Sequence, residues 1–114
     1  MPRSRRRPAL VHPDVDELDV LQVLHALADP TRMSIVQTLI VDQERACGTF
    51  PVEVAPSTLT HHFRVLREAG VIRQREDGNR RWTMLRLEDL DARFPGLLDA
   101  ILNAHNRQAN PAPV

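Results

Sequence analysis

The side chains with the most evident chemistry lie between positions 57 and 68. Thr58, Thr60, His61, Arg64 and Arg67 bring hydroxyl, imidazole and guanidinium groups together at helical spacing. Groups of these kinds bind phosphate oxygens and the edges of bases in DNA. A solvated surface helix carries a similar polar face, so the flanking segments decide between the two interpretations.

A helix has to position these side chains. Apolar residues recur at spacings of three and four from Leu59 to Ala69, which predicts an amphipathic helix of about three turns. Ser57 is suited to cap its start, and Gly70 is suited to the left-handed conformation that ends a helix. Within the adjacent histidine pair, we expect His61 to face outward and His62 to lie partly buried.

Two extended runs follow this helix and predict a β-hairpin. Residues 71–76 and 80–87 flank a glycine-containing turn at 77–79. In the second run Trp82 and Met84 are expected to face the core, because they alternate with polar residues. Arginine dominates the other face and the tip. A helix that fits the major groove, followed by an arginine-tipped hairpin, indicates a winged helix-turn-helix.

Two further helices are predicted upstream. Broad apolar faces indicate a first helix from Val15 to Ala28. Asp29 is suited to cap the next helix, and Pro30 fits its first position, where a missing N–H costs no hydrogen bond. That second helix is expected to end between Asp42 and Arg45.

The order of these motifs is that of a known family. The chain resembles the ArsR/SmtB family of bacterial winged-helix repressors in two sequences, ALADPTRMSIVQTL at 26–39 and STLTHHFRVLREAGVI at 57–72. The resemblance extends over roughly residues 15–105. It implies a mainly α fold with a small β-hairpin: a dimeric winged helix-turn-helix with the element order α-α-α-α-β-β-α.

The resemblance also implies a function. It indicates a homodimeric, sequence-specific DNA-binding transcriptional regulator that acts as a repressor on an inverted-repeat operator. Positions that the family uses to touch DNA, together with the wing, give the DNA-binding candidates Ser57, Thr58, Thr60, His61, Arg64, Arg67, Arg80 and Arg81. The alternative is a winged-helix module that binds proteins without reading DNA, which would expose more aromatic and aliphatic side chains.

The charge distribution agrees with a DNA partner although the net charge is zero. All fifteen basic residues are arginines, and residues 57–86 hold seven of them against three acidic residues. The acidic residues gather elsewhere, at 14–19 and 88–91. We therefore expect a basic face on a neutral protein, as attraction to phosphate requires.

A single domain with two extended ends is expected. Residues 1–13 are predicted to form a flexible basic arm, residues 14–106 the DNA-binding and dimerisation domain, and residues 107–114 a flexible tail. Arg3, Arg5, Arg6 and Arg7 of the arm either contact DNA or remain solvated. The solvated tail is preferred, because blocks of charge near a terminus are commonly disordered.

A last helix is predicted from Pro95 to about His105, after a turn of helix at 88–94. One small domain leaves the apolar faces of this helix and of the first helix to a second copy. The predicted dimer interface consists of Leu18, Leu21, Leu98, Ile101 and Leu102. Such a dimer would place two recognition helices roughly 34 Å apart, about one turn of DNA.

The sensing chemistry is expected to depart from that of the arsenic- and lead-type members of the family. Those proteins carry a Cys-x-Cys pair on the helix before the recognition helix, because soft metals require converging thiolates. The corresponding residues 44–50 contain a single cysteine, Cys47, and so lack the second thiolate of the pair. We interpret Cys47 as a small buried side chain rather than a redox sensor. The other histidines, His12, His25 and His105, are isolated, so no metal and no cofactor are expected. The effector is left open.

Neither an enzyme nor a membrane protein is expected. The chain has no glycine-rich phosphate loop and no recognisable catalytic triad, and pairing of Cys47 with a histidine as nucleophile and base is disfavoured. It also lacks a run of about 18 apolar residues and an apolar leader segment. With a single cysteine, these features predict a cytoplasmic protein.

Overall fold

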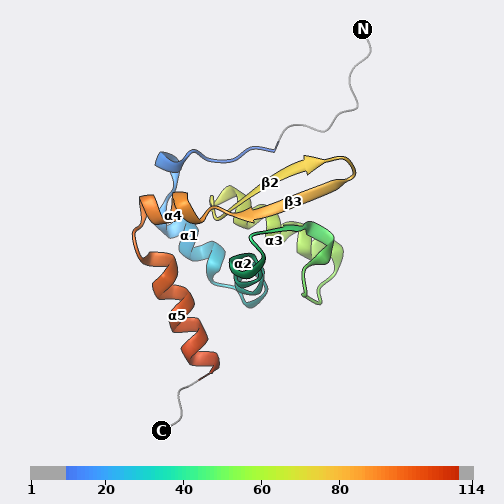
Figure 1. The fold of residues 1–114 in the computed structure, drawn as a ribbon. Coiled ribbons are helices and arrows are strands. Elements are labelled where there is room, and N and C mark those ends of the chain that lie inside the picture. Colours follow the sequence, from blue (N-terminus) through green and yellow to red (C-terminus); the bar gives the residue numbers. More distant parts are fainter. Residues whose placement is uncertain (1–9, 111–114) are drawn as a thin grey trace.

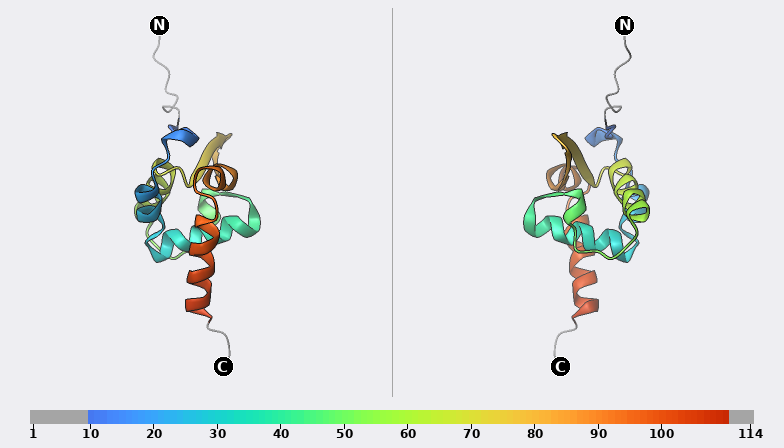
Figure 2. Two further views of the ribbon diagram at one scale, coloured as in Figure 1. Left: turned by 90° about the vertical axis from the view of Figure 1, so that its left-hand side faces the viewer. Right: turned by 90° about the vertical axis from the view of Figure 1, so that its right-hand side faces the viewer.

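The computed structural model describes residues 10–110, which form five α-helices, two short 3-10 helices and three β-strands. In chain order these are the 3-10 helix Val15–Glu17, α1 (Val20–Leu27), α2 (Pro30–Asp42), β1 (Glu44–Ala46), the 3-10 helix Cys47–Thr49, α3 (Pro56–Glu68), β2 (Ile72–Asp77), β3 (Arg80–Leu85), α4 (Leu87–Arg93) and α5 (Leu97–Ala109). The hairpin of β2 and β3 extends to one side of the helical body (Figure 1). Helix α5 leaves that body in another direction (Figure 2).

The core lies where α1, α2 and α3 meet the hairpin. Ile35 of α2, Leu66 of α3 and Ile72 of β2 are all completely buried. The loop before α3 is fastened to that helix by Phe50, whose ring meets that of Phe63 edge-on at a centroid distance of 5.2 Å. The apolar stripe of α3 is therefore covered from both sides, as its spacing predicts.

The two central helices begin in different ways. Asp29 caps α2 as predicted: its carboxylate accepts a hydrogen bond from the backbone N–H of Arg32 at 3.0 Å. Helix α3 starts at Pro56, and no side chain caps it. The predicted cap at Ser57 is therefore wrong. Proline supplies the helical φ angle and has no N–H to leave unpaired, so the cap position falls at Ala55 and the helix starts two residues earlier than a cap at Ser57 would require.

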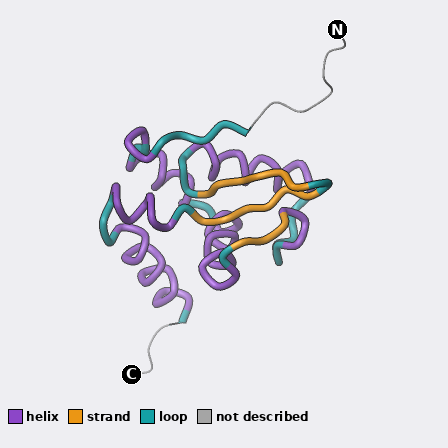
Figure 3. Tube along the Cα trace, turned by 45° about the horizontal axis from the view of Figure 1, so that its top comes forward, coloured by secondary structure: helices purple, strands orange, loops and turns teal. Residues whose placement is uncertain are grey.

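The strands form an antiparallel sheet in the order β1-β3-β2 (Figure 3). The central strand β3 pairs with β1, where Ala46 lies opposite Trp82. It pairs with β2 from Ile72 opposite Leu85 to Asp77 opposite Arg80. Strand β1 was not predicted because its three residues are too few to show an alternating pattern. Strand β2 is left as an edge strand.

The winged helix-turn-helix fold is confirmed, although its element order differs in detail. Three α-helices rather than four precede the hairpin, and two follow it. Residues 44–50 form β1 and a 3-10 turn instead of a helix. The first predicted helix is broken, because Asp19 caps a new start by accepting from the N–H of Gln22 at 3.1 Å. The last helix starts at Leu97 because Gly96 adopts a left-handed φ of 79°.

The predicted inward face of β3 is wrong. Met84 is 40% exposed, whereas Thr83 is completely buried. The Thr83 hydroxyl lies 3.0 Å from the side-chain nitrogen of Gln74 and 3.3 Å from Sγ of Cys47. Because these partners satisfy the hydroxyl, its burial carries little cost. Trp82 lies half-buried on the other face.

Helix α5 is attached by its first turns and by one polar contact. Its start meets α1 and α4 through Val23, Leu27, Leu90, Phe94, Leu97 and Leu98. Further along, the side-chain amide of Gln37 in α2 donates to Asn106 at 2.8 Å.

The predicted dimer interface changes when burial is considered. Leu18, Leu98 and Leu102 are buried within the chain itself, so they have little surface left for a second copy. Leu21 is 70% exposed and Ile101 is half-buried. Of the five predicted residues, these two retain accessible apolar surface.

Candidate nucleic-acid interface

The outer face of α3 carries most of the predicted DNA-binding side chains. Ser57, Thr58, Thr60, His61 and Arg64 are all exposed there. The Thr60 hydroxyl donates to a backbone carbonyl of its own helix at 3.0 Å, and its lone pairs remain able to accept. The result is a short row of hydroxyl, imidazole and guanidinium groups on one side of a helix.

His62 points the opposite way and is buried, as predicted. Its Nδ1 lies 3.0 Å from a terminal nitrogen of Arg32, and because a guanidinium only donates, Nδ1 accepts. Arg32 is 8% exposed, and it also donates to the carbonyls of Ala26 at 2.7 Å and His25 at 3.3 Å. This one side chain joins the end of α1, the start of α2 and the inner face of α3.

Arg67 differs from the other candidates because it turns toward the wing. Its guanidinium donates to the side-chain oxygen of Gln74 at 2.7 Å. Gln74 is 3% exposed, and its amide nitrogen donates to Thr83 at 3.0 Å and to Cys47 at 3.2 Å. Its backbone N–H donates to Nε2 of His12 at 3.0 Å. Gln74 thus joins α3, the hairpin, the turn after β1 and the N-terminal segment.

Several wing arginines are paired with carboxylates. Arg75 lies 3.0 Å from Glu44 of β1 and 3.4 Å from Asp77. Arg81 pairs with Glu76 across the hairpin at 2.7 Å. Both arginines are partly exposed, so these pairs arrange charge on the surface and contribute little to stability.

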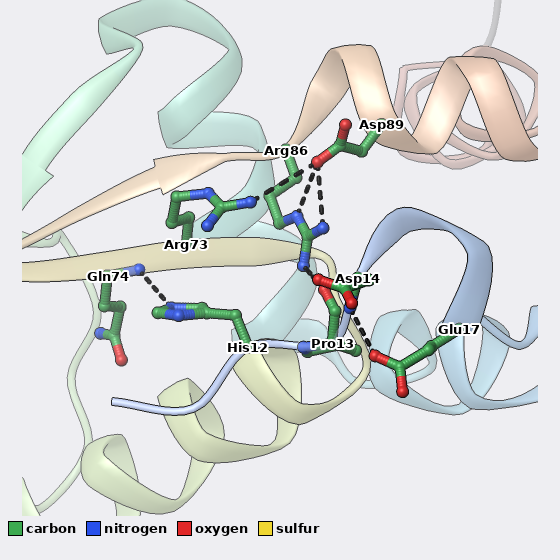
Figure 4. Close-up of polar contacts among 8 residues, drawn as sticks. All are labelled: His12, Pro13, Asp14, Glu17, Arg73, Gln74, Arg86 and Asp89. Carbon is green, nitrogen blue, oxygen red and sulfur yellow. Dashed lines mark hydrogen bonds and ion pairs between the residues drawn. The ribbon is translucent and has the colours of Figure 1, made fainter. Parts of the chain in front are cut away.

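At the base of the wing, Asp89 of α4 receives two arginines (Figure 4). Arg73 lies 3.7 Å from its carboxylate and Arg86 lies 3.0 Å from it. Arg86 is 5% exposed, and it also donates to the carbonyl of Pro13 at 2.7 Å. Arg86, the residue after β3, is therefore buried, and it connects α4 to the N-terminal segment.

These pairs reduce the basic excess predicted for residues 57–86. Glu44 and Asp89, which lie outside that window, neutralise part of it. Within the described part of the chain, Arg64 and Arg80 form no ion pair, and Arg80 lies 6.0 Å from the ring centroid of Trp82. Arg64 and Arg80 therefore keep unpaired positive charge on the outer face of α3 and at the wing tip.

Cys47 lies half-buried beside β2 and β3, where its Sγ contacts Gln74 and Thr83. Burial raises the pKa of its thiol, outweighing the opposing effects of Thr83 and of neighbouring arginines. A thiol that stays protonated is a weak nucleophile and a poor metal ligand. Its hydrogen bonds with Gln74 and Thr83 fit a structural role.

Residues 10–110 contain no group of three or more histidine, cysteine, aspartate or glutamate side chains arranged to hold a metal ion. None of the helices in this range is both long and apolar enough to cross a membrane.

Sequence reasoning missed three residues that organise the site. They are Gln74, Arg86 and His12, the last of which was interpreted as isolated. Gln74 carries a weak signal, because it falls two residues after the buried Ile72 on the inward side of β2. The contacts of His12 with Gln74 and of Arg86 with Pro13 span 62 and 73 residues, and no local pattern indicates contacts over such separations.

Comparison with known proteins gives the same fold and places the chain in a family. Residues 27–75, from the end of α1 into the wing, match a family of helix-turn-helix domains. The HTH-type transcriptional regulator YceK of Bacillus subtilis (strain 168) is 32% identical over 83 residues. That alignment covers 70% of this chain and 83% of the relative.

Solved structures share the architecture. A possible transcriptional regulator for arsenical resistance is 30% identical with a TM-score of 0.57, over 80% of this chain and 96% of that one. The homodimeric winged helix-turn-helix domain of Mb0332 from Mycobacterium bovis, a possible ArsR-family regulator, is 24% identical with a TM-score of 0.60. That alignment covers 82% of this chain and 87% of the other. This chain belongs to the helix-turn-helix transcriptional regulators, DNA-binding proteins whose ArsR-type members share its winged-helix fold.

Proposed function

We propose that the protein is a homodimeric repressor that acts in the cytoplasm on an inverted-repeat operator. The outer face of α3 carries this proposal. Its five exposed polar and cationic side chains form no hydrogen bond or ion pair with any described residue outside that helix. A face that the fold leaves unused, and that carries hydroxyl, imidazole and guanidinium groups rather than large aliphatic, phenyl, phenol or indole groups, suits a DNA groove better than a protein partner.

The side chains divide by chemistry into two roles. Arg64 and Arg80 are suited to bind phosphates and so to contribute affinity for any sequence. Thr58, Thr60 and His61 are suited to bind base edges, where the pattern of donors and acceptors distinguishes base pairs. Arg67 and Arg81 already have partners within the chain, so we assign them a smaller share of the DNA binding.

The dimer is proposed to form through α1 and α5. Leu21 and Leu24 of α1 are 70% and 40% exposed, and Ile101 of α5 is half-buried. Exposed apolar side chains on neighbouring helices are typical of an interface. The fold-related domain from Mycobacterium bovis is a homodimer, which supports the same arrangement here.

No organic effector is assigned, and a trithiolate site for a soft metal is not proposed. The chain supplies one thiol per protomer, and burial keeps that thiol protonated. Two alternative functions are a redox-sensing regulator that uses Cys47 and a winged-helix module that binds proteins without reading DNA. No contact of the described residues favours either function.

The recognition role is tested with two matched threonine variants. Thr60→Ala removes the hydroxyl that we expect to bind a base edge, and the preference for operator over random DNA should fall by about 1–3 kcal/mol. Thr38→Ala is the control, because the Thr38 hydroxyl makes the same bond to its own helix, 2.9 Å to the carbonyl of Ser34. The measurement is fluorescence anisotropy on DNA from upstream of the protein's own gene and on random DNA. An equal preference for operator over random DNA in Thr60→Ala and Thr38→Ala would show that α3 does not recognise the operator sequence.

The dimer is tested with two exposed apolar residues. Leu21→Gln should shift the protein toward a monomer in sedimentation velocity at micromolar concentration, because it places an amide in the interface. Val41→Gln is the control, since Val41 is 79% exposed but belongs to α2, which is not one of the two helices of the proposed interface. A Leu21→Gln protein that remains a dimer would show that this face of α1 is not the dimer interface.

A further inference from the structure

A groove lies where the end of α2, the base of the wing and the start of α4 meet. Its volume is about 430 Å³, which is within the range of sites for small molecules. The wing contributes Met84 of β3 and Arg73 of β2, which lie directly opposite each other across the two strands. Ile40 of α2 and Leu87 of α4 complete the rim. An occupant of this groove would therefore touch three separate parts of the fold.

Much of the groove is apolar. Ile40, Met84 and Leu87 come from three different elements, and each is at least 40% exposed. Leu39 and Leu85, both buried, continue the apolar lining toward the core. Large apolar side chains that stay exposed together mark a surface where a partner or a ligand binds. The lining therefore suits a molecule with an apolar body.

The polar end of the groove holds a guanidinium with free donors. Nε of Arg86 donates to the carboxylate of Asp89 at 3.0 Å, whereas Arg73 reaches that carboxylate only as an ion pair at 3.7 Å (Figure 4). Arg86 is buried and also donates to the carbonyl of Pro13, so the fold uses its guanidinium. The guanidinium of Arg73 is about half-exposed and donates no hydrogen bond to any described residue. Two arginines thus share one carboxylate, which leaves an excess of positive charge.

This excess indicates the head group of the ligand. A guanidinium with free donors binds a carboxylate through two parallel hydrogen bonds. Because Arg73 lies opposite Met84, a carboxylate bound there would hold its apolar body against the apolar lining. Glu88 also lines the groove and acts against an anion, but no strand register places it beside Met84. We infer that the groove binds a small organic acid, a carboxylate with an apolar body, and that it is the effector site which the proposed function leaves unassigned.

A ligand in this groove would act on the base of the wing. Its carboxylate competes with Asp89 of α4 for Arg73 of β2, and its apolar body lies between α2 and β3. A ligand shifts a conformational equilibrium only as far as it binds one state better, and this one binds better once Arg73 has left Asp89. DNA binding requires α3 and the wing in a fixed relative position, so we expect DNA affinity to fall. This effector role rests on the proposed function, whereas binding of the acid does not.

The first test measures binding in the absence of DNA. Octanoate, octylamine and 1-octanol share one alkyl chain and differ in the head group, and each is used below the concentration at which it forms micelles. In a titration followed by amide NMR signals, octanoate should shift those of Arg73, Met84 and Leu87. The other two probes should bind at least about tenfold more weakly. Equal binding of the three probes, or shifts confined to residues outside the groove, would overturn the inference.

The second test changes the charges that line the groove. Arg73→Gln should weaken octanoate binding by about tenfold, because the guanidinium is lost. Arg75→Gln is the matched control, since Arg75 lies on the same strand but pairs with Glu44 and does not line the groove. Glu88→Gln should tighten binding by about twofold, because it removes the opposing charge. Weaker octanoate binding in Glu88→Gln, or unchanged binding in Arg73→Gln, would overturn the carboxylate site.

The third test measures the effect on DNA binding by fluorescence anisotropy. Saturating octanoate should lower the affinity of the wild type for operator DNA by about fivefold or more, and should leave the affinity of Arg73→Gln unchanged. 1-Octanol is the control for non-specific effects of the chain. Octanoate that occupies the groove without changing DNA affinity would overturn the effector role. Failure of the proposed function is distinguishable, because Thr60→Ala would then keep the wild-type sequence preference while octanoate still bound in the NMR titration.

Discussion

Arginine is used in opposite ways before and after α3. We call the region where α1, α2 and α3 meet the junction. There Arg32 is 8% exposed and donates to two carbonyls and to the ring of His62. In the wing after α3, Arg80 is exposed, and Arg81 pairs with Glu76 on a solvated hairpin. The first guanidinium is part of the core, and the second pair of arginines carries charge on the surface.

The comparison teaches that burial, rather than count, decides what an arginine does in this neutral protein. A buried guanidinium is tolerated only when its N–H groups are hydrogen-bonded. Its removal therefore leaves the buried acceptors of those bonds without a donor. An exposed guanidinium is hydrated, so its removal costs the fold little but weakens the field that attracts phosphate. Substitutions in the junction should therefore impair folding, and substitutions in the wing should impair binding.

The largest effect is expected at the junction. Arg32→Leu leaves the carbonyls of Ala26 and His25 and the Nδ1 of His62 without their donor, and should lower the free energy of unfolding by about 3 kcal/mol. Urea denaturation measures the loss. Arg107→Leu, on an exposed part of α5, is the control and should change stability by less than about 0.5 kcal/mol. Similar losses of unfolding free energy in Arg32→Leu and Arg107→Leu would show that buried and exposed arginines do not differ in their contribution to stability.

The next effect is expected where α3 ends and the wing begins. Gly70 has a φ of 83°, and a Cβ there would meet Leu18, so Gly70→Ala should cost about 2 kcal/mol in unfolding free energy. Gly78→Ala, at the wing tip, shares the left-handed backbone with a φ of 65° but has open space around it. It should cost about 1 kcal/mol. Equal costs in the two variants would show that the contact with Leu18 does not constrain Gly70.

Much of the junction could be predicted from sequence because its signals are local. Asp29 and Pro30 mark a helix start within two residues, and the spacing of Leu59 to Ala69 sets the faces of α3. The opposite orientations of His61 and His62 follow from that spacing alone.

The wing was predicted less well because its faces depend on distant partners. Trp82 and Met84 alternate with Thr83 and its neighbours, so either face of β3 could have been inward by pattern. Gln74 and Cys47 decide the matter by satisfying the Thr83 hydroxyl. Likewise, the local basic excess could be counted in sequence, but its neutralisation by residues beyond that window could not.

A smaller effect is expected from the cap of α2. Asp29→Ala removes the acceptor for the Arg32 N–H and should cost about 1 kcal/mol. Burial acts to raise the pKa of Asp29, but the hydrogen bond to the backbone of Arg32 and the charge of that residue outweigh it, and the pKa is lowered.

The sign of that shift gives a pH dependence. A lowered pKa means that the stabilisation is present above the usual pKa of an aspartate and is lost as the pH falls through the lowered value. The stability difference between wild type and Asp29→Ala should therefore be largest near neutral pH and shrink in acid. Asp19→Ala, which removes the equivalent cap of α1, is the control for the loss of a cap. A difference that grows in acid would contradict the assigned sign.

The smallest effect on stability is expected in the wing. Arg81→Ala breaks the exposed pair with Glu76, and its buried Nε has no acceptor among the described residues, so removing it also relieves an unsatisfied donor. Unfolding free energy should change by at most about 0.5 kcal/mol. DNA affinity should nevertheless fall at low salt, and Glu76→Gln, which removes the opposing charge, should raise it. If Arg81→Ala instead destabilised the fold as strongly as Arg32→Leu, the wing arginine would belong with the buried one. Arg32 and Arg81 would then differ only in where they lie in the chain, and not in what they contribute to stability.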